Sequence, residues 1–158
     1  STDSPPLWSG YARGSDLGDA LERGSGGFVV RPSPEDEQAL AVDAVRSCLS
    51  GGRRAIVLVP EASPVPATTN ALVQAFGARV CVFAGGDARS RYRTWLAIRD
   101  GVFDVVVGTR PAVFAPLSEV GLVWVSRESH PGHREERAPY YHVRDVAIRR
   151  AQLADAVC

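Results

Sequence analysis

The chain contains neither lysine nor methionine, and all 18 of its basic residues are arginine. Without lysine, the chain has no side chain for Schiff-base chemistry and no phosphate-loop lysine. Because there is no methionine, we expect a fragment or processed piece of a longer protein. The three cysteines, Cys48, Cys81 and Cys158, are too few and too scattered to predict a disulfide framework or a zinc site, and they favour a reducing cytoplasm.

Long apolar runs and an excess of charge of one sign are also missing. No stretch approaches the roughly 18 apolar residues that a membrane-spanning helix needs, and the first residues lack the pattern of a secretion signal. The 18 basic and 18 acidic residues balance. The net charge changes from −3 in residues 1–61 to +3 in residues 62–158, which permits nucleic-acid contact in the second part without requiring it. A chain of 158 residues, 45% of them hydrophobic, is expected to form one core.

Residues 28–158 alternate between short apolar runs and helical patterns, whereas residues 1–27 are interpreted as a linker or N-terminal arm with a short helix at 15–23. The apolar runs are continuous, as in strands covered on both faces of a parallel sheet. Strands alternating with helices predict an α/β fold, a three-layer sandwich with about five mostly parallel strands. Strands are expected at 28–30, 55–59, 79–83, 104–107 and 122–125, and helices at 33–50, 66–76, 88–100 and 141–156. In the helix at 88–100, we expect Tyr92, Trp95 and Leu96 to face the core.

The carboxyl ends of the strands are where such folds bind ligands. After the first strand, residues 31–38 contain two prolines and three acids, Glu35, Asp36 and Glu37. These suit an ordinary helix start and would repel a polyphosphate. Pro60 and Glu61 follow the next strand. Gly108-Thr109-Arg110 follows a third, where amides, a hydroxyl and a guanidinium suit a phosphate or carboxylate.

Other constellations are given their simpler interpretation. His130, His133 and His142 are expected to be solvated, and no metal site is predicted. Ser126 or Ser129 near His130 could suggest a hydrolase, but the glycines of a nucleophile elbow are absent. Three further side chains, Arg89, Arg91 and Arg93, are interpreted as a solvated face, with DNA contact as the alternative.

Several longer motifs follow one another in the order and spacing of a known family. They are Ala55-Ile-Val-Leu-Val-Pro-Glu61, Trp95-Leu-Ala-Ile-Arg-Asp-Gly101, Asp104-Val-Val-Val-Gly-Thr-Arg-Pro-Ala-Val-Phe-Ala-Pro116, Gly121-Leu-Val-Trp-Val125 and Tyr141-His-Val-Arg-Asp-Val-Ala147. Over roughly residues 28–152 the chain resembles the first helicase lobe of the primosomal protein N′ (PriA) replication-restart DNA helicases. The resemblance implies a RecA-like P-loop lobe with ATP and magnesium as the family's cofactors, and with zinc in a region that is absent here.

The chain departs from the family where ATP chemistry is expected. The phosphate loop of the family aligns with Arg31 to Ala39, and Gln38 stands where its lysine would be. The Asp-Glu-Glu-His motif of the family aligns with residues 126–129. Here Ser126 and Arg127 replace the first two acids, Glu128 is retained, and Ser129 replaces the histidine. The chain therefore resembles degenerate actinobacterial members, and we expect no catalytic residue and no bound cofactor.

The resemblance implies a DNA-binding, helicase-like lobe of a replication-restart protein without ATPase or helicase activity. The alternative is a structural or interaction module of the primosome that does not bind DNA itself. The residues expected at DNA are Thr109 and Arg110, with Pro60 and Glu61 shaping the adjacent loop. The simpler interpretation of Arg110 is an ion pair with Asp104 or Glu128. The expected partners are single-stranded or forked DNA and other primosome proteins, in the cytoplasm and without a membrane.

Overall fold

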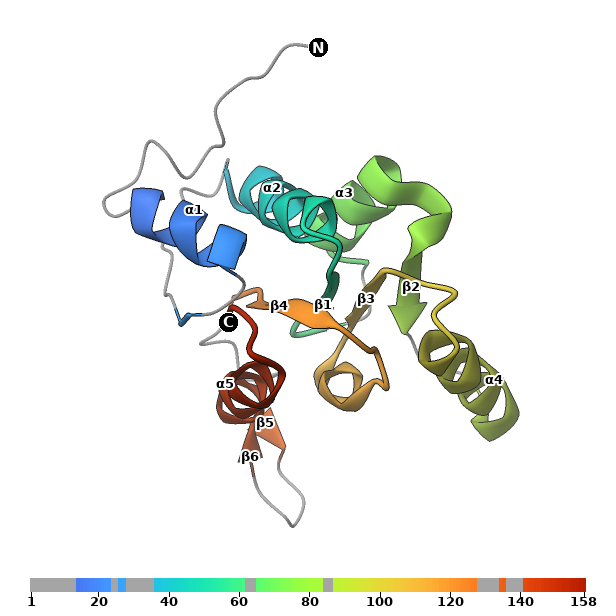
Figure 1. The fold of residues 1–158 in the computed structure, drawn as a ribbon. Helices are drawn as coiled ribbons and strands as arrows, with labels where there is room; N and C mark the ends of the chain where they lie inside the picture. The colour runs from blue at the N-terminus through green and yellow to red at the C-terminus, as the bar shows by residue number, and fades with distance from the viewer. Residues whose placement is uncertain are drawn as a thin grey trace.

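A computed structural model describes residues 14–23, 26–27, 36–61, 65–83, 87–127, 134–135 and 141–158. Within these ranges, α-helices and strands alternate along most of the chain (Figure 1). The helices are α1 (Gly14–Arg23), α2 (Glu37–Ser50), α3 (Ala67–Phe76), α4 (Ala88–Arg99) and α5 (Val143–Ala154), with 3-10 helices η2 (Gly77–Arg79) and η3 (Arg110–Phe114). The strands are β1 (Arg54–Leu58), β2 (Val80–Phe83), β3 (Val105–Gly108), β4 (Val120–Val125), β5 (Arg134–Glu135) and β6 (Tyr141–His142).

The central sheet contains four parallel strands in the order β2-β3-β1-β4. In its register, Ala55 of β1 lies between Val105 of β3 and Leu122 of β4. The sheet confirms the predicted α/β class, and four of the five predicted strands are present within one or two residues of their expected bounds. The fifth, at 28–30, lies outside the described residues.

Helices cover both faces of the sheet and make three layers (Figure 1). On one face, α1, α2 and α3 pack against Val57, Val105 and Leu122. On the other, η3, α4 and α5 pack against Ile56, Val106 and Val123. Neighbouring residues of one strand thus enter different cores, which explains why the strands are continuous apolar runs.

The outer edge of β4 is covered by the C-terminal segment. The amide of Val123 donates to the carbonyl of Val157, and the amide of Val157 donates to the carbonyl of Gly121. The guanidinium of Arg53 donates to the carbonyls of Val120, Ala154 and Asp155, which joins the start of β4 to the end of α5. These bonds fix α5 to the sheet across about 100 residues of chain.

The prediction for the inward face of α4 is wrong at Tyr92. This side chain is 63% exposed, Trp95 and Leu96 are only partly buried, and Ile98 is the buried residue of the helix. The reason is that α4 lies beside β2, at the edge of the sheet, so the sheet covers only part of the helix (Figure 1). The β5–β6 hairpin, where Arg134 pairs with His142, was not predicted.

Candidate functional site

The carboxyl ends of the four central strands lie along one edge of the sheet. Phe83, Gly108, Leu58 and Val125 end β2, β3, β1 and β4 in that spatial order. The amide of Val59 donates to the carbonyl of Gly108, and the amide of Ser126 donates to the carbonyl of Leu58. The residues that were predicted for the site and that the structure describes therefore meet at this edge. They are residues 36–39, 60–61, 109–110 and 126–127.

At the β4 end, Ser126 is linked to the start of α2. Its hydroxyl donates to Glu37 Oε1 at 3.0 Å, and Ser126 is buried. Glu37 is the first residue of α2, where the helix dipole favours a carboxylate. Two positions that the family resemblance assigns to ATP chemistry are thus joined by a hydrogen bond within the chain.

The described residues next to Glu37 and Ser126 lie at the surface. Gln38 and Ala39, in the first turn of α2, are exposed. Arg127 is exposed and adopts a left-handed backbone with φ 51°. Residues 31–35, Glu128, Ser129, His130 and His133 lie outside the described residues.

ATP and magnesium, the cofactors implied by the family, do not fit the residues described here. A phosphate at the first turn of α2 would lie beside the Glu37 carboxylate, and like charges repel. Ser126 offers a neutral hydroxyl where the family has an aspartate for magnesium. Among the described residues, no group of three or more His, Cys, Asp or Glu side chains is placed to hold a metal ion.

At the β3 end, the chain turns sharply from Gly108 into η3. The amide of Ala112 donates to the carbonyl of Thr109 at 2.8 Å, which closes the first turn. A Cβ atom at Gly108 would lie 2.8 Å from both Ala112 Cβ and the carbonyl oxygen of Phe83. Glycine is required here because there is no space for a side chain between β2 and η3.

Helix α5 holds η3 in place from the other side. The Arg150 guanidinium donates to the carbonyl of Val113 and, at 3.3 Å, to that of Leu117. Partial burial of the guanidinium lowers the pKa of Arg150. The sequence analysis missed this contact, because a lone arginine on a helix gives no sign of which carbonyls it reaches.

Thr109 and Arg110 lie half-buried at this turn, one strand away from Pro60 and Glu61. Pro60 is buried and Glu61 is exposed, so Pro60 belongs to the support of the loop and Glu61 to its surface. The alternative pairing of Arg110 with Asp104 is wrong. Asp104 precedes β3, at the opposite end of the strand, where it binds Arg79 at 2.8 Å and Arg54 at 3.4 Å.

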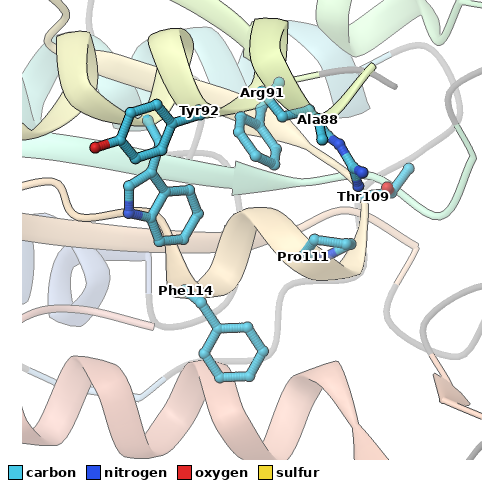
Figure 2. A pocket seen from close by; sticks show the side chains of 8 residues that line it. Ala88, Arg91, Tyr92, Thr109, Pro111 and Phe114 are labelled. Atoms are coloured by element: carbon cyan, nitrogen blue, oxygen red, sulfur yellow. The ribbon is translucent and has the colours of Figure 1, made fainter. Parts of the chain in front are cut away.

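A pocket of about 620 Å³ opens beside this turn, between α4 and η3 (Figure 2). The side chains that line it are Phe83, Ala88, Arg91, Tyr92, Trp95, Thr109, Pro111 and Phe114. The sequence analysis missed the pocket because it assigned Tyr92 and Trp95 to the core. The only sequence signal was the number of aromatic residues on either side of the Gly-Thr-Arg turn.

The histidine and the cysteines that the structure describes have contacts that belong to the fold. His142 precedes α5, and its Nδ1 accepts a hydrogen bond from the amide of Arg144 at 3.0 Å. All three cysteines are free thiols. Burial raises the pKa of Cys48 and of Cys158 to about 11, so neither is activated as a nucleophile. Within the described ranges, no helix is long and apolar enough to cross a membrane.

Comparison with known proteins gives a consistent set of relatives, although no family model matches the chain. The probable replication restart protein PriA of Mycobacterium tuberculosis is 36% identical over 155 residues, which is 95% of this chain and 24% of the relative. Replication restart protein PriA of Bacillus subtilis is 35% identical over 112 residues, or 70% of this chain and 14% of the relative. That of Synechocystis is 36% identical over 107 residues, or 66% and 13%.

The chain spans a quarter or less of the length of these curated relatives. The mycobacterial protein matches nearly the whole chain, whereas the other two match about two thirds of it. The family named from the motifs is thus found independently by overall sequence similarity. By sequence, this chain is a homologue of the replication restart proteins named PriA.

Proposed function

We propose that this chain is a DNA-binding, helicase-like lobe of a primosomal replication-restart protein, and that it does not hydrolyse ATP. The observation that carries the proposal is the contrast between two neighbouring strand ends. The β4 end is occupied by the Ser126–Glu37 hydrogen bond, whereas the β3 end presents Thr109 and Arg110 beside an open pocket. The names of the relatives support the restart role.

The proposed ligand is single-stranded or forked DNA, bound through its backbone at the Gly108-Thr109-Arg110 turn. A hydroxyl and a guanidinium beside a 3-10 turn are suited to phosphate oxygens. Such contacts carry no sequence information, so binding is expected to be independent of sequence and sensitive to salt. The proposed location is the cytoplasm, and the proposed protein partners are other components of the primosome.

The test uses Arg110→Ala, with Arg46→Ala on the opposite face of the sheet as the matched control. Fluorescence anisotropy with labelled single-stranded DNA over a salt series measures affinity, and a thermal melt measures stability. Loss of one phosphate contact should weaken binding by about 1.5–3 kcal/mol and reduce the salt slope by about 0.7. The loss of DNA affinity should exceed what any change in melting temperature accounts for, and Arg46→Ala should bind as the wild type does.

The absence of ATP hydrolysis is tested by calorimetric titration with Mg-ATP. We expect no binding at millimolar nucleotide, and no rescue of hydrolysis by Gln38→Lys alone. The reason is that Glu37 and Ser126 would still lie where phosphate and magnesium are needed. A micromolar dissociation constant for Mg-ATP would contradict this part of the proposal.

A second candidate function is an interaction module of the primosome. It is favoured by two exposed apolar side chains on α5, Ile148 and Leu153. If Arg110→Ala lowers only the melting temperature and leaves DNA binding unchanged, the interaction module becomes the better description.

A further inference from the structure

The pocket between α4 and η3 has a feature that a backbone-binding site does not need, namely exposed aromatic rings. Tyr92 is 63% exposed and Phe114 is 52% exposed, and both line the pocket. The Tyr92 ring lies on the α4 side, whereas the Phe114 ring points from η3 toward α5 (Figure 2). Exposing aromatic surface of this size to water is unfavourable. Two such rings at one cavity therefore indicate a ligand that covers them.

Two aromatic rings that pack against each other form the inner wall of the pocket. The rings of Phe83 and Trp95 pack against each other with centroids 5.8 Å apart at a 57° angle, a favourable tilted arrangement. Phe83 ends β2 and Trp95 belongs to α4, so this contact fixes the helix to the edge of the sheet. The volume of about 620 Å³ lies in the range of pockets that hold small molecules, about 300–1,000 Å³.

Arginines are in excess beside the pocket, and one acid, Asp87, caps α4 and interacts with the charge of Arg91. Arg91 lines the pocket, and Arg89 and Arg93 are exposed on the same helix. Residues 88–99 contain four arginines and no acid. Aromatic rings next to arginines are the combination with which proteins bind single-stranded nucleic acid, because bases stack on the rings while the cations follow the phosphates.

The pocket also continues directly into the proposed DNA-backbone site. Thr109 belongs to both, since it lines the pocket and follows Gly108 at the end of β3.

We propose that this pocket receives unstacked bases of single-stranded DNA, one against Tyr92 and another against Phe114, with Arg91 facing the adjoining phosphate. The inference rests on the proposed function, since it adds a base subsite to the backbone contact at Thr109 and Arg110. Stacking on ring faces suits every base, so the subsite selects unpaired over paired bases and not one sequence over another.

The experiment separates base from backbone by using two fluorescein-labelled oligonucleotides of equal length, oligo-dT and its fully abasic counterpart. Both carry the same phosphates, so only a base subsite distinguishes them. Tyr92→Ala and Phe114→Ala are compared with Leu153→Ala, which truncates another exposed apolar side chain, on α5. Tyr92→Phe keeps the ring, and thermal melts show that each variant is folded.

We expect the full chain to bind oligo-dT more tightly than the abasic strand. Tyr92→Ala and Phe114→Ala should each weaken oligo-dT binding roughly 5- to 150-fold and leave abasic binding unchanged. Tyr92→Phe and Leu153→Ala should match the wild type. Equal binding of both oligonucleotides, or a preference that survives both alanine variants, overturns the base subsite while leaving the backbone site intact. Binding of neither oligonucleotide overturns the proposed function and the subsite together.

Discussion

The β4 end and the β3 end of the sheet are built from the same elements, a buried parallel strand followed by a polar turn. They differ in what fills the space beyond the strand. At β4, Ser126 reaches across to Glu37 and the chain satisfies its own polar groups. At β3, the missing side chain of Gly108 lets η3 fold back, and an aromatic pocket stays open beside it. One hydrogen bond can thus close a strand end, whereas an open strand end needs space that is maintained by the packing around it.

The largest effect on this comparison is expected from Gly108→Ala, because the added methyl group would meet Ala112 and Phe83 at 2.8 Å. Relieving that overlap requires a shift of η3, which should lower the free energy of unfolding by about 1–3 kcal/mol. DNA binding should weaken with it, since Thr109 and Arg110 move too. Urea denaturation and anisotropy measure the two effects.

Gly51→Ala is the control for this substitution. Its nearest neighbour would be a carbonyl oxygen at an ordinary 3.4 Å, and its φ of −79° suits any residue. It should leave stability nearly unchanged. Equal stabilities of Gly108→Ala and Gly51→Ala would show that η3 is not held against Gly108 as described.

A smaller effect is expected from Ser126→Ala at the closed strand end. Removing the hydroxyl takes one hydrogen bond from the Glu37 carboxylate, which should lower the free energy of unfolding by about 1–2 kcal/mol. Glu37→Gln keeps an acceptor oxygen and should cost less. Unlike Gly108→Ala, Ser126→Ala should leave DNA affinity unaltered; a joint loss of stability and DNA binding would contradict the separation of the two strand ends.

The smallest effect is expected from Asp104→Asn, at the amino ends of the strands. The hydrogen bond from Arg79, and then that from Arg54, lower the pKa of Asp104 below its usual 3.8. The ionised carboxylate therefore stabilises the fold above pH 3.8, and this contribution is lost as the pH falls through the lowered value. Because the pair is partly exposed, the variant should lose at most about 1 kcal/mol at pH 7.

A pH series of urea denaturations tests the sign as well as the size. The stability difference between wild type and Asp104→Asn should narrow as the pH falls below 3.8. Asp100→Asn is the control, since that exposed carboxylate lies 3.6 Å from Arg99 at the surface and should matter less. A difference that stays constant down the series would mean that the charge of Asp104 plays no part.

The sheet could be predicted from the sequence because each strand is a continuous apolar run that no surface strand would carry. The sequence also predicted that the residues after these strands lie together, because the carboxyl ends of parallel strands are all on the same side. These are residues 60–61, 109–110 and 126. What could not be predicted depends on the order of strands in space. The Ser126–Glu37 contact joins residues 89 apart in the sequence, and it exists because α2 packs beside both β1 and β4.

The aromatic pocket was missed for a different reason. Tyr92, Trp95 and Leu96 have the spacing of a helix face that packs on a core, and the spacing is the same whether or not anything covers that face. Coverage depends on the position of the neighbouring strand, and β2 lies at the edge of the sheet. An edge strand is a property of the assembled sheet, which local periodicity does not contain.

The hydrogen bonds that Arg53 donates to the start of β4 and to the end of α5 limit which residues these positions can carry. The planar guanidinium of Arg53 reaches three carbonyls at once, at 2.7–2.8 Å, a geometry that the single ammonium of lysine does not offer. Beside it, a side chain at Gly121 would meet Arg53 Cβ at 2.7 Å. Gly121 is therefore expected to stay glycine whichever side chain stands at position 53, because every residue except glycine carries the Cβ atom that it would meet.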